Sequence, residues 1–256
     1  MPTAASLYYF AHEANNHSRP SVILIHGAGG SHLSWPPQLR RLHDQRMFAL
    51  DLPAHGKSEG IGHHAIEDYV HDVLEFMSEI GVYSAILVGH SMGSAVALLA
   101  AICFPERVIA LALVGSGRRL RVAPALLRAA SDSSTFESAV RMINDASFSS
   151  QSVRIKELST QRMMETRPAV LYGDLIACEA FDVMDQLSKL SLPTLIVCGS
   201  DDKMTPLRYS EFLRDHIAGA CLEVVPNAGH MVMLEQPNIM SDLLADFLNS
   251  IPYHSE

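Results

Sequence analysis

The chain has 256 residues, of which 48% are hydrophobic and 18% charged. This composition indicates a globular protein with a large core and excludes an intrinsically disordered one. The net charge of -9 argues against nucleic acid as a partner, because phosphate binding requires a basic surface. A chain of this length is near the upper limit for a single core, so we expect either one domain with an insertion or two domains.

The cysteines and the N-terminus bear on the cellular compartment. Cys103, Cys178, Cys198 and Cys221 are widely spaced and each lies in an apolar pattern, which suits buried thiols better than disulfides or a zinc site. The first ten residues contain no basic segment, and no run in the chain reaches about 18 uninterrupted apolar residues. We therefore expect a soluble, cytoplasmic protein with no stable membrane insertion. The oligomeric state stays open.

The first part of the chain predicts alternating strands and helices. Residues 7–12, 22–25 and 47–50 form short strand patterns, and the continuous apolar run 22–25 is typical of a strand covered on both faces of a parallel sheet. The segment before this run is too short for the usual opening hairpin, so we expect one clear strand there. Residues 66–80 carry apolar side chains every three or four positions and predict an amphipathic helix.

The alternation continues and then breaks. Residues 85–88 and 108–114 predict two more strands, separated by a helix that is apolar on all sides. We expect an α/β fold with a doubly wound, mostly parallel sheet and right-handed crossovers. From 118 to 190 the sequence shows helix patterns and no convincing strand, and strands return at 195–198 and 222–225. The predicted organisation is therefore a core of residues 1–117 and 191–256 with a helical cap at 118–190.

One turn between a strand and a helix has the composition of a catalytic site. It reads Gly89-His90-Ser91-Met92-Gly93, a Gly-x-Ser-x-Gly pattern that holds a serine in a strained conformation and exposes its hydroxyl. Glycines flank the serine because side chains there would collide where strand and helix close together. The pentapeptide alone is a weak signal, since an ordinary Gly/Ser turn has the same composition.

Three further polar segments each follow a predicted strand. They are His26-Gly27-Ala28-Gly29, Gly199-Ser200-Asp201-Asp202 and Asn227-Ala228-Gly229-His230. Open parallel sheets place ligand sites at these carboxyl ends. With the serine turn, the four segments make the chain resemble the α/β-hydrolase family, specifically its carboxylesterase- and lipase-like serine hydrolases with a helical cap. The resemblance covers essentially the whole length.

The resemblance and acid-base chemistry assign the same roles. Serine is a poor nucleophile at neutral pH, so Ser91 needs a base, and His230 titrates in the range required to accept and return the proton. Asp202 would orient the imidazole and stabilise its charged form. The backbone N–H groups of Ala28 and Met92 would bind the tetrahedral oxyanion.

Two adjacent aspartates compete for the role of the orienting acid. The family pattern places this acid three residues after the glycine that ends the strand and four before a proline. Counting from Gly199 towards Pro206 selects Asp202, and Asp201 is expected to face solvent or brace the turn.

Some segments depart from the family pattern or suggest other ligands. Ala54 stands where the family's Asp-x-x-Gly-x-Gly-x-Ser stretch has its first glycine, which we expect to alter a turn and not the chemistry. Gly56-Lys57-Ser58 ends like a phosphate-binding loop, but the first glycine of that motif is missing. His64, Asp68 and His71 share a helical face, and such exposed sets are usually solvated, so we predict neither a metal site nor a cofactor.

The predicted activity is hydrolysis of a small-molecule carboxylic ester with an apolar acyl or aromatic group. Trp35, Met163 and Tyr172 are the candidate substrate contacts. Apolar cap side chains supply material for the roof of a pocket: Leu126, Leu127, Met142, Met163, Met164 and Tyr172.

Three alternatives stay open at this point. The same scaffold serves carbon-carbon bond hydrolases for vinylogous diketones, and basic residues at the cap entrance, Arg118, Arg119 and Arg121, are the local feature that favours this activity. A thioesterase, lactonase or perhydrolase is equally compatible with the triad. A non-enzymatic receptor that holds a ligand on the same scaffold is the third, since fold alone does not exclude it.

Overall fold

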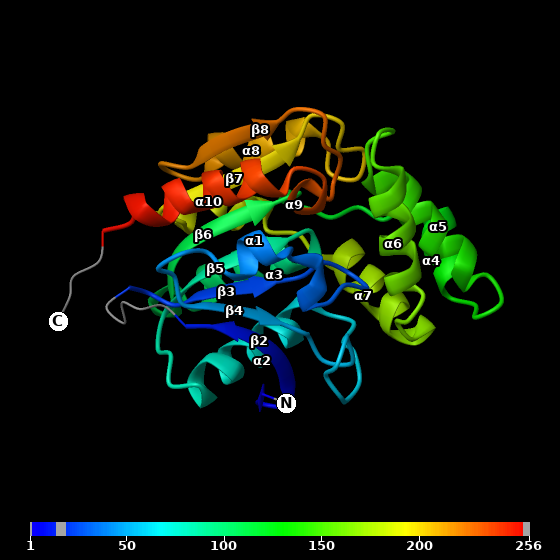
Figure 1. Ribbon diagram of the computed structural model, residues 1–256, viewed down its shortest axis with the longest axis horizontal. Helices are drawn as coiled ribbons and strands as arrows, with labels where there is room; N and C mark the ends of the chain where they lie inside the picture. Colours follow the sequence, from blue (N-terminus) through cyan, green and yellow to red (C-terminus); the bar gives the residue numbers. More distant parts are fainter. Residues whose placement is uncertain (1, 14–18, 253–256) are drawn as a thin grey trace.

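A single sheet forms the centre of the molecule in the computed structural model, which describes residues 2–13 and 19–252 (Figure 1). In these residues eight strands pair in the order β1-β2-β4-β3-β5-β6-β7-β8. The first two pairings, β1 with β2 and β2 with β4, are antiparallel, and all the others are parallel. The strands are β1 (Thr3–Ala4), β2 (Leu7–His12), β3 (Val22–Ile25), β4 (Met47–Leu50), β5 (Ala85–His90), β6 (Val108–Val114), β7 (Thr194–Gly199) and β8 (Cys221–Val225).

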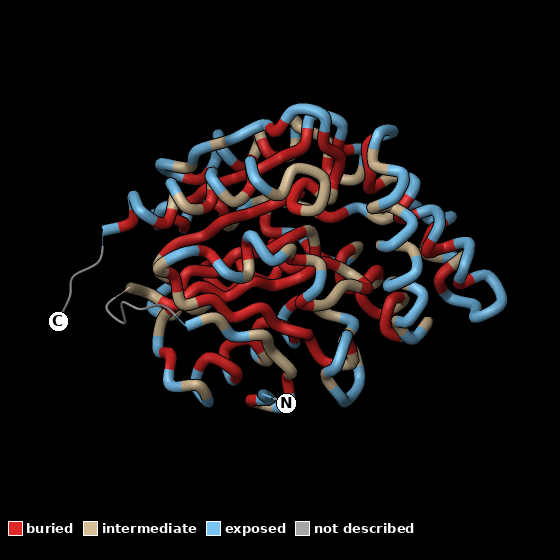
Figure 2. The backbone as a smooth tube through the Cα atoms, in the orientation of Figure 1, coloured by how far each residue is buried: buried red, intermediate tan, exposed pale blue. Residues whose placement is uncertain are grey.

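Successive side chains of each central strand enter two different cores. In β3, Ile23 and Ile25 pack into the core beneath α2 (Ile66–Glu79), α3 (Met92–Cys103) and α8 (Leu207–His216). Val22 and Leu24 pack into the core beneath α1 (Pro37–Arg40), α9 (Val232–Glu235) and α10 (Pro237–Ser250). This follows from the two-residue period of a strand that is buried on both faces. Figure 2 shows the central strands buried along their length. The prediction of a doubly wound, mostly parallel α/β sheet is confirmed.

Helices cover both faces of the sheet, and in Figure 1 α1 and α10 lie in front of it. The amphipathic helix predicted over residues 66–80 is confirmed as α2, whose apolar side chains are buried. The helices of the core are α1 (Pro37–Arg40), α2 (Ile66–Glu79), α3 (Met92–Cys103), α8 (Leu207–His216), α9 (Val232–Glu235) and α10 (Pro237–Ser250), with short 3₁₀ helices η1 (His32–Ser34) and η2 (Pro105–Arg107).

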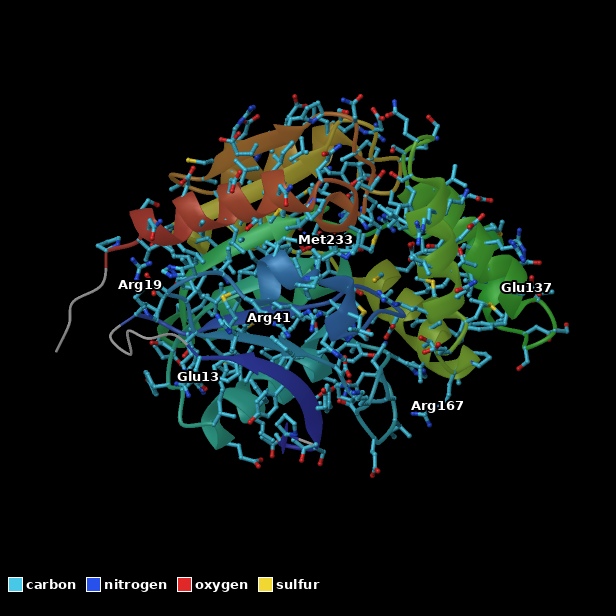
Figure 3. All side chains as sticks on the ribbon, viewed as in Figure 1. Glu13, Arg19, Arg41, Glu137, Arg167 and Met233 are labelled. Atoms are coloured by element: carbon cyan, nitrogen blue, oxygen red, sulfur yellow. The ribbon has the colours of Figure 1, made fainter. Side chains whose placement is uncertain are left out.

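The segment between β6 and β7 is helical and stands at one end of the sheet (Figure 1). It has its own small apolar cluster, in which side chains of α4, α5 and α7 meet. In Figure 3, Glu137 lies on the outer side of this segment, away from the sheet. We call residues 118–190 the helical segment. It contains α4 (Pro124–Ala130), α5 (Phe136–Ser147), α6 (Val153–Met163), α7 (Pro168–Ala180) and the 3₁₀ helix η3 (Met184–Lys189).

The N-terminus differs from the expectation of a single strand. The structure has a hairpin, because Thr3 and Ala4 form a two-residue strand paired with Tyr8 and Leu7. The turn is closed by Ala5 and Ser6, both with positive φ. A strand of two residues is too short to show the alternation of apolar and polar side chains by which a strand is recognised in a sequence.

Ala54, at the position where the family pattern has a glycine, has a backbone conformation that favours glycine. Its φ is +68°, in the left-handed region where a Cβ atom costs about 1 kcal/mol or more. The turn is held by Ala54 N–H donating to the Glu59 carbonyl at 3.0 Å and by Ser58 Oγ donating to the Asp51 carbonyl at 2.6 Å. An alanine at this position therefore strains the turn.

This strain predicts opposite responses to two substitutions. Ala54→Val should lower the free energy of unfolding by about 2 kcal/mol, because a β-branched side chain tolerates the left-handed region poorly. Ala54→Gly should leave it equal or raise it by up to about 1 kcal/mol, since relief of strain is partly offset by the entropy of an unfolded glycine. Urea denaturation of the three proteins measures both. A stabilising valine would contradict the strained turn.

No helix in residues 2–13 and 19–252 is long and apolar enough to cross a membrane.

Candidate active site

Ser91 occupies a sharp turn between β5 and α3. Its φ and ψ are +53° and -116°, a combination that few non-glycine residues adopt. A Cβ atom added at Gly89 would lie 2.2 Å from the Gly93 carbonyl oxygen, and one added at Gly93 would lie 2.2 Å from that of Ile25. Ser91 N–H donates to the Val114 carbonyl at 2.9 Å, which ties the turn to β6. The strained serine is thus held between glycines that no other residue could replace.

A buried aspartate lies against the ring of His230. The loops after β7 and β8 bring Asp202 Oδ2 to 2.9 Å from His230 Nδ1. The N–H groups of Met204 and Thr205 donate to the other carboxylate oxygen at 2.8 Å each, and the Thr205 hydroxyl donates to Oδ2 at 2.8 Å. Burial would raise the pKa of Asp202, but the charge and hydrogen bond of His230 and the donors of Thr205 lower it. The carboxylate is therefore ionised at neutral pH.

The two ring nitrogens of His230 have different surroundings. Because the ionised Asp202 can only accept, Nδ1 is the nitrogen that carries the proton. The other nitrogen, Nε2, is buried and has no hydrogen-bond partner among the described residues. Ser91 and His230 line the same cavity. They share no hydrogen bond in the part of the chain that the structure describes, and catalytic hydrogen bonds are commonly long before a substrate binds. The free nitrogen has the lone pair that a general base needs.

His90, the residue before the serine, supports the His230 loop. Its ring lies 4.7 Å from that of His230, and its Nε2 is 3.1 Å from the His230 carbonyl oxygen. Burial and the neighbouring His230 lower the pKa of His90 well below its usual value. A neutral His90 can donate from Nε2 to this carbonyl without placing a second charge beside the base. Motif reasoning missed both His90 and Thr205. An Asp-x-x-Thr turn pattern could have revealed Thr205.

The loop after β3 packs against the serine turn. A Cβ atom added at Gly27 would lie 2.9 Å from His90 Nδ1 and 3.1 Å from Ser91 Cβ. Ala28, the next residue, lines the cavity with Ser91. Met92 is the first residue of α3, where a backbone N–H has no carbonyl one turn earlier in the helix. Two backbone donors are therefore available on the segments that meet at the serine.

A cavity of about 1050 Å³ opens over these residues. The helical segment contributes most of its apolar lining, including Leu126, Met142, Ile155 and Met163. Leu127 and Met164, which we expected in the roof, do not line it. The cavity thus has Ser91 and His230 on the sheet side and apolar side chains of the helical segment opposite.

Two of the three expected substrate contacts lie elsewhere, which corrects those expectations. Trp35 is fully buried in the core beneath α1, α9 and α10, and Tyr172 packs against the apolar cluster inside the helical segment. Neither lines the cavity. In both cases the ring packs against apolar side chains away from the cavity. Met163 does line the cavity and stays a candidate contact.

The three arginines near the start of the helical segment have different surroundings. Arg118 lies over the ring of Phe212 at 3.9 Å, and Arg119 pairs with Asp182. Arg121 lines the cavity and also pairs with Glu179 at 3.0 Å. One of the three can therefore reach a bound molecule. No group of three or more His, Cys, Asp or Glu side chains in the described ranges could hold a metal ion.

Comparison with known proteins agrees with this geometry. Residues 22–242 match the model of the "Alpha/beta hydrolase family". The chain is 27% identical to "3-oxoadipate enol-lactonase 1" of Acinetobacter baylyi, over 91% of this chain and 90% of that one. It also resembles a solved thermophilic esterase, with 32% identity, a TM-score of 0.81 and coverage of 97% of this chain and 100% of the other.

A further solved structure shares the fold. The enol-lactonase from Burkholderia xenovorans LB400 superimposes with a TM-score of 0.87 at 22% identity, covering 95% of this chain and 96% of the other. With a family model matched over most of its length and an eight-stranded sheet of the corresponding order, the chain belongs to the α/β-hydrolase family and is a hydrolase.

Proposed function

We propose that this chain is a serine hydrolase that cleaves carboxylic esters of apolar acyl or aromatic substrates. The observation that carries the proposal is the buried His230, which lines the same cavity as Ser91: one ring nitrogen lies on the Asp202 carboxylate, and the other has no hydrogen-bond partner among the described residues. A neutral imidazole held in this tautomer, next to a serine on a strained turn, is the arrangement that activates a hydroxyl.

The reaction proceeds in two halves. Ser91 Oγ attacks the ester carbonyl carbon while His230 Nε2 takes its proton, and Asp202 stabilises the resulting imidazolium. The N–H groups of Ala28 and Met92 bind the oxyanion of the tetrahedral intermediate. The intermediate then expels the alcohol, which receives the proton from His230. Water attacks the acyl-enzyme by the same proton transfers and releases the acid and free Ser91.

The substrate preference follows from the lining of the cavity. Residues 118–190 act as a cap over the core of residues 1–117 and 191–256, and the cap supplies apolar side chains to the wall opposite Ser91. An apolar wall of this kind binds an acyl chain or an aromatic ring and offers little to a sugar. The acyl group is therefore expected to lie under the cap.

A lactonase is the second candidate. It is favoured by the similarity to the Acinetobacter baylyi relative named an enol-lactonase. A lactone is a cyclic ester, so the same nucleophile, base and oxyanion donors would open it.

A substrate panel tests the proposal. Purified protein is assayed on p-nitrophenyl esters of increasing acyl length, an aryl thioester, lactones and a vinylogous diketone. Highest kcat/KM on an ester supports the proposal, and highest kcat/KM on a lactone supports the second candidate. Faster cleavage of the diketone than of any ester would instead favour a carbon-carbon bond hydrolase. Binding without turnover of any compound would favour a receptor.

A substitution in the cap should change acyl-chain preference. Ile155 in α6 lines the cavity, so Ile155→Trp should shorten the preferred acyl chain by several carbons through loss of pocket volume. Val153→Trp is the matched control, because Val153 lies on the same helix, is 61% exposed and does not line this cavity. The ratio of kcat/KM for octanoyl and acetyl esters is the measurement. Equal ratios in both variants would contradict a cap that covers the acyl group.

A further inference from the structure

A carboxylate of the helical segment is buried against the core. Asp174 lies in α7 and is fully buried. Its Oδ2 accepts the Gly29 N–H at 2.8 Å and faces His55 Nε2 at 2.8 Å, and its Oδ1 accepts the Tyr69 hydroxyl at 2.5 Å. The three partners come from the loop after β3, the loop after β4 and helix α2. One side chain of α7 thus joins three separate parts of the core.

The charge of Asp174 is balanced inside this cluster. His55 Nδ1 lies 2.9 Å from the Pro53 carbonyl oxygen, which can only accept. Its Nε2 faces Asp174, so both ring nitrogens donate when the carboxylate is ionised. Burial would lower the pKa of His55, but the charge of Asp174 raises it. Burial and the neighbouring carboxylate raise the pKa of Tyr69, which keeps its hydroxyl a donor. A buried carboxylate with these partners is fully satisfied.

Side chains of the helical segment form hydrogen bonds with both the N–H and the carbonyl oxygen of Gly29. Asp174 accepts its N–H, and Thr166 Oγ1 donates to its carbonyl oxygen at 3.1 Å. Gly29 has a φ of +62°, so its peptide groups turn sharply in a loop that has no sheet partner. The two side chains of the helical segment therefore fix the orientation of the peptide groups on both sides of Gly29.

These peptide groups adjoin the proposed oxyanion donor. The Ala28 N–H belongs to the same planar peptide as the Gly27 carbonyl, whose oxygen is 2.8 Å from His26 Nδ1 and accepts the Gly30 N–H at 3.0 Å. The next peptide carries the Gly29 N–H that Asp174 holds. Since neighbouring planes share a Cα atom, movement of the Gly29 peptide would rotate the Ala28 N–H away from the oxyanion.

We propose that Asp174, which belongs to the cap, is a positioning residue for the oxyanion loop. Its carboxylate, whose charge is balanced by His55, fixes the Gly29 peptide and through it the orientation of the Ala28 N–H. The inference rests on the proposed function. It gives the cap a role in the chemical step as well as in substrate choice, because a preorganised donor stabilises the transition state more than the ground state.

The test compares Asp174→Asn with the same substitution in another Asp–His pair. Asp72→Asn is the control, because Asp72 also pairs with a histidine, His63, at 2.7 Å but lies outside the loop after β3. With p-nitrophenyl butyrate, Asp174→Asn should lower kcat about 10- to 50-fold with KM changed less than about threefold, which is less than the 10² to 10³ expected for deletion of an oxyanion donor. Asp72→Asn should keep both constants within about twofold.

The affinity for a transition-state analogue distinguishes a positioning role from a purely structural one. Phenylboronic acid forms a tetrahedral adduct on the serine, so its Ki should rise in Asp174→Asn by about the same factor as kcat/KM falls. Circular dichroism checks that the variant is folded. If Asp174→Asn does not fold, Thr166→Val removes the donor to the Gly29 carbonyl and should lower kcat about 3- to 10-fold by the same mechanism.

The outcomes separate the two proposals. Wild-type protein without Ser91-dependent turnover overturns the proposed function and this inference with it. An active wild type with folded Asp174→Asn and Thr166→Val variants that match Asp72→Asn in kcat and in Ki overturns the inference alone. A loss confined to KM also overturns it, because a misplaced oxyanion donor acts on the chemical step.

Discussion

Ser91→Ala should fold normally and lower kcat on an aryl ester by about 10⁶, the loss seen when a serine nucleophile is removed from a complete triad. The reason is that the methyl group cannot form the acyl-enzyme, so only the oxyanion donors and substrate binding are left. The turn itself should persist, because alanine keeps the Cβ atom of serine and the backbone hydrogen bonds of residue 91, to Val114 and from Ser94 and Ala95, do not involve the side chain. The measurement is kcat of both proteins on p-nitrophenyl butyrate, with thermal unfolding as the check of folding.

A serine-directed fluorophosphonate gives an independent measurement of the same hypothesis. It should label the wild type at Ser91 and leave Ser91→Ala unlabelled, as read by peptide mass spectrometry. Ser116 is the matched control, since it also lies between glycines at the end of a strand but is fully buried. Ser116→Ala should keep activity and labelling close to wild type. Labelling at Ser116, or full activity in Ser91→Ala, would contradict the assignment.

The sheet could be predicted from the sequence because its strands are buried on both faces. A strand such as β3 has four apolar residues in a row, a pattern that fits a strand covered on both faces. The runs at residues 108–114 and 195–198 are also apolar, and a glycine or proline lies near each of their ends. The loops at the carboxyl ends then fall at one edge by topology alone. The proximity of Asp202 to His230 was therefore implied once the strand order was known.

The features that the sequence did not predict depend on contacts that leave no pattern in the neighbouring residues. Trp35 and Met163 are both large apolar side chains, and nothing in their neighbours indicates that one enters the core and the other the cavity. Asp174 lies 145 residues from Gly29 in the chain, and its role depends on how α7 packs against the core. The two-residue strand β1 is too short for any periodicity.

The helical segment contacts two of the loops that carry the proposed catalytic residues. His230 N–H donates to the Ser147 carbonyl at the end of α5, at 2.7 Å, and Glu235 holds both Gly229 N–H and Ser149 N–H. The helical segment thus touches the loop of His230 at one end, as Asp174 of α7 touches the loop after β3 at the other. Changes in the cap are expected to reach the chemistry through these hydrogen bonds and the substrate through the apolar wall.

The environments of the two adjacent aspartates predict very different effects of the same substitution. Asp202 is buried and contacts the His230 ring, whereas Asp201 is exposed and its Oδ1 accepts a hydrogen bond from the neighbouring Ser200 hydroxyl at 3.0 Å. Asp201→Asn should keep this bond and lower kcat/KM by less than about tenfold, the size of effect expected outside the catalytic unit.

Asp202→Asn should lower kcat/KM by about 10⁴, or roughly 5 kcal/mol of transition-state stabilisation, with folding intact. The amide oxygen can still accept the N–H groups of Met204 and Thr205, which turns the amide nitrogen towards His230 Nδ1. A donor at this position forces Nδ1 to accept, so the proton moves to Nε2 and this nitrogen can no longer act as the base. The charge that stabilises the imidazolium disappears as well. Measuring kcat/KM of both variants on one aryl ester decides between the aspartates, and a larger loss in Asp201→Asn would mean that Asp202 is not the orienting acid.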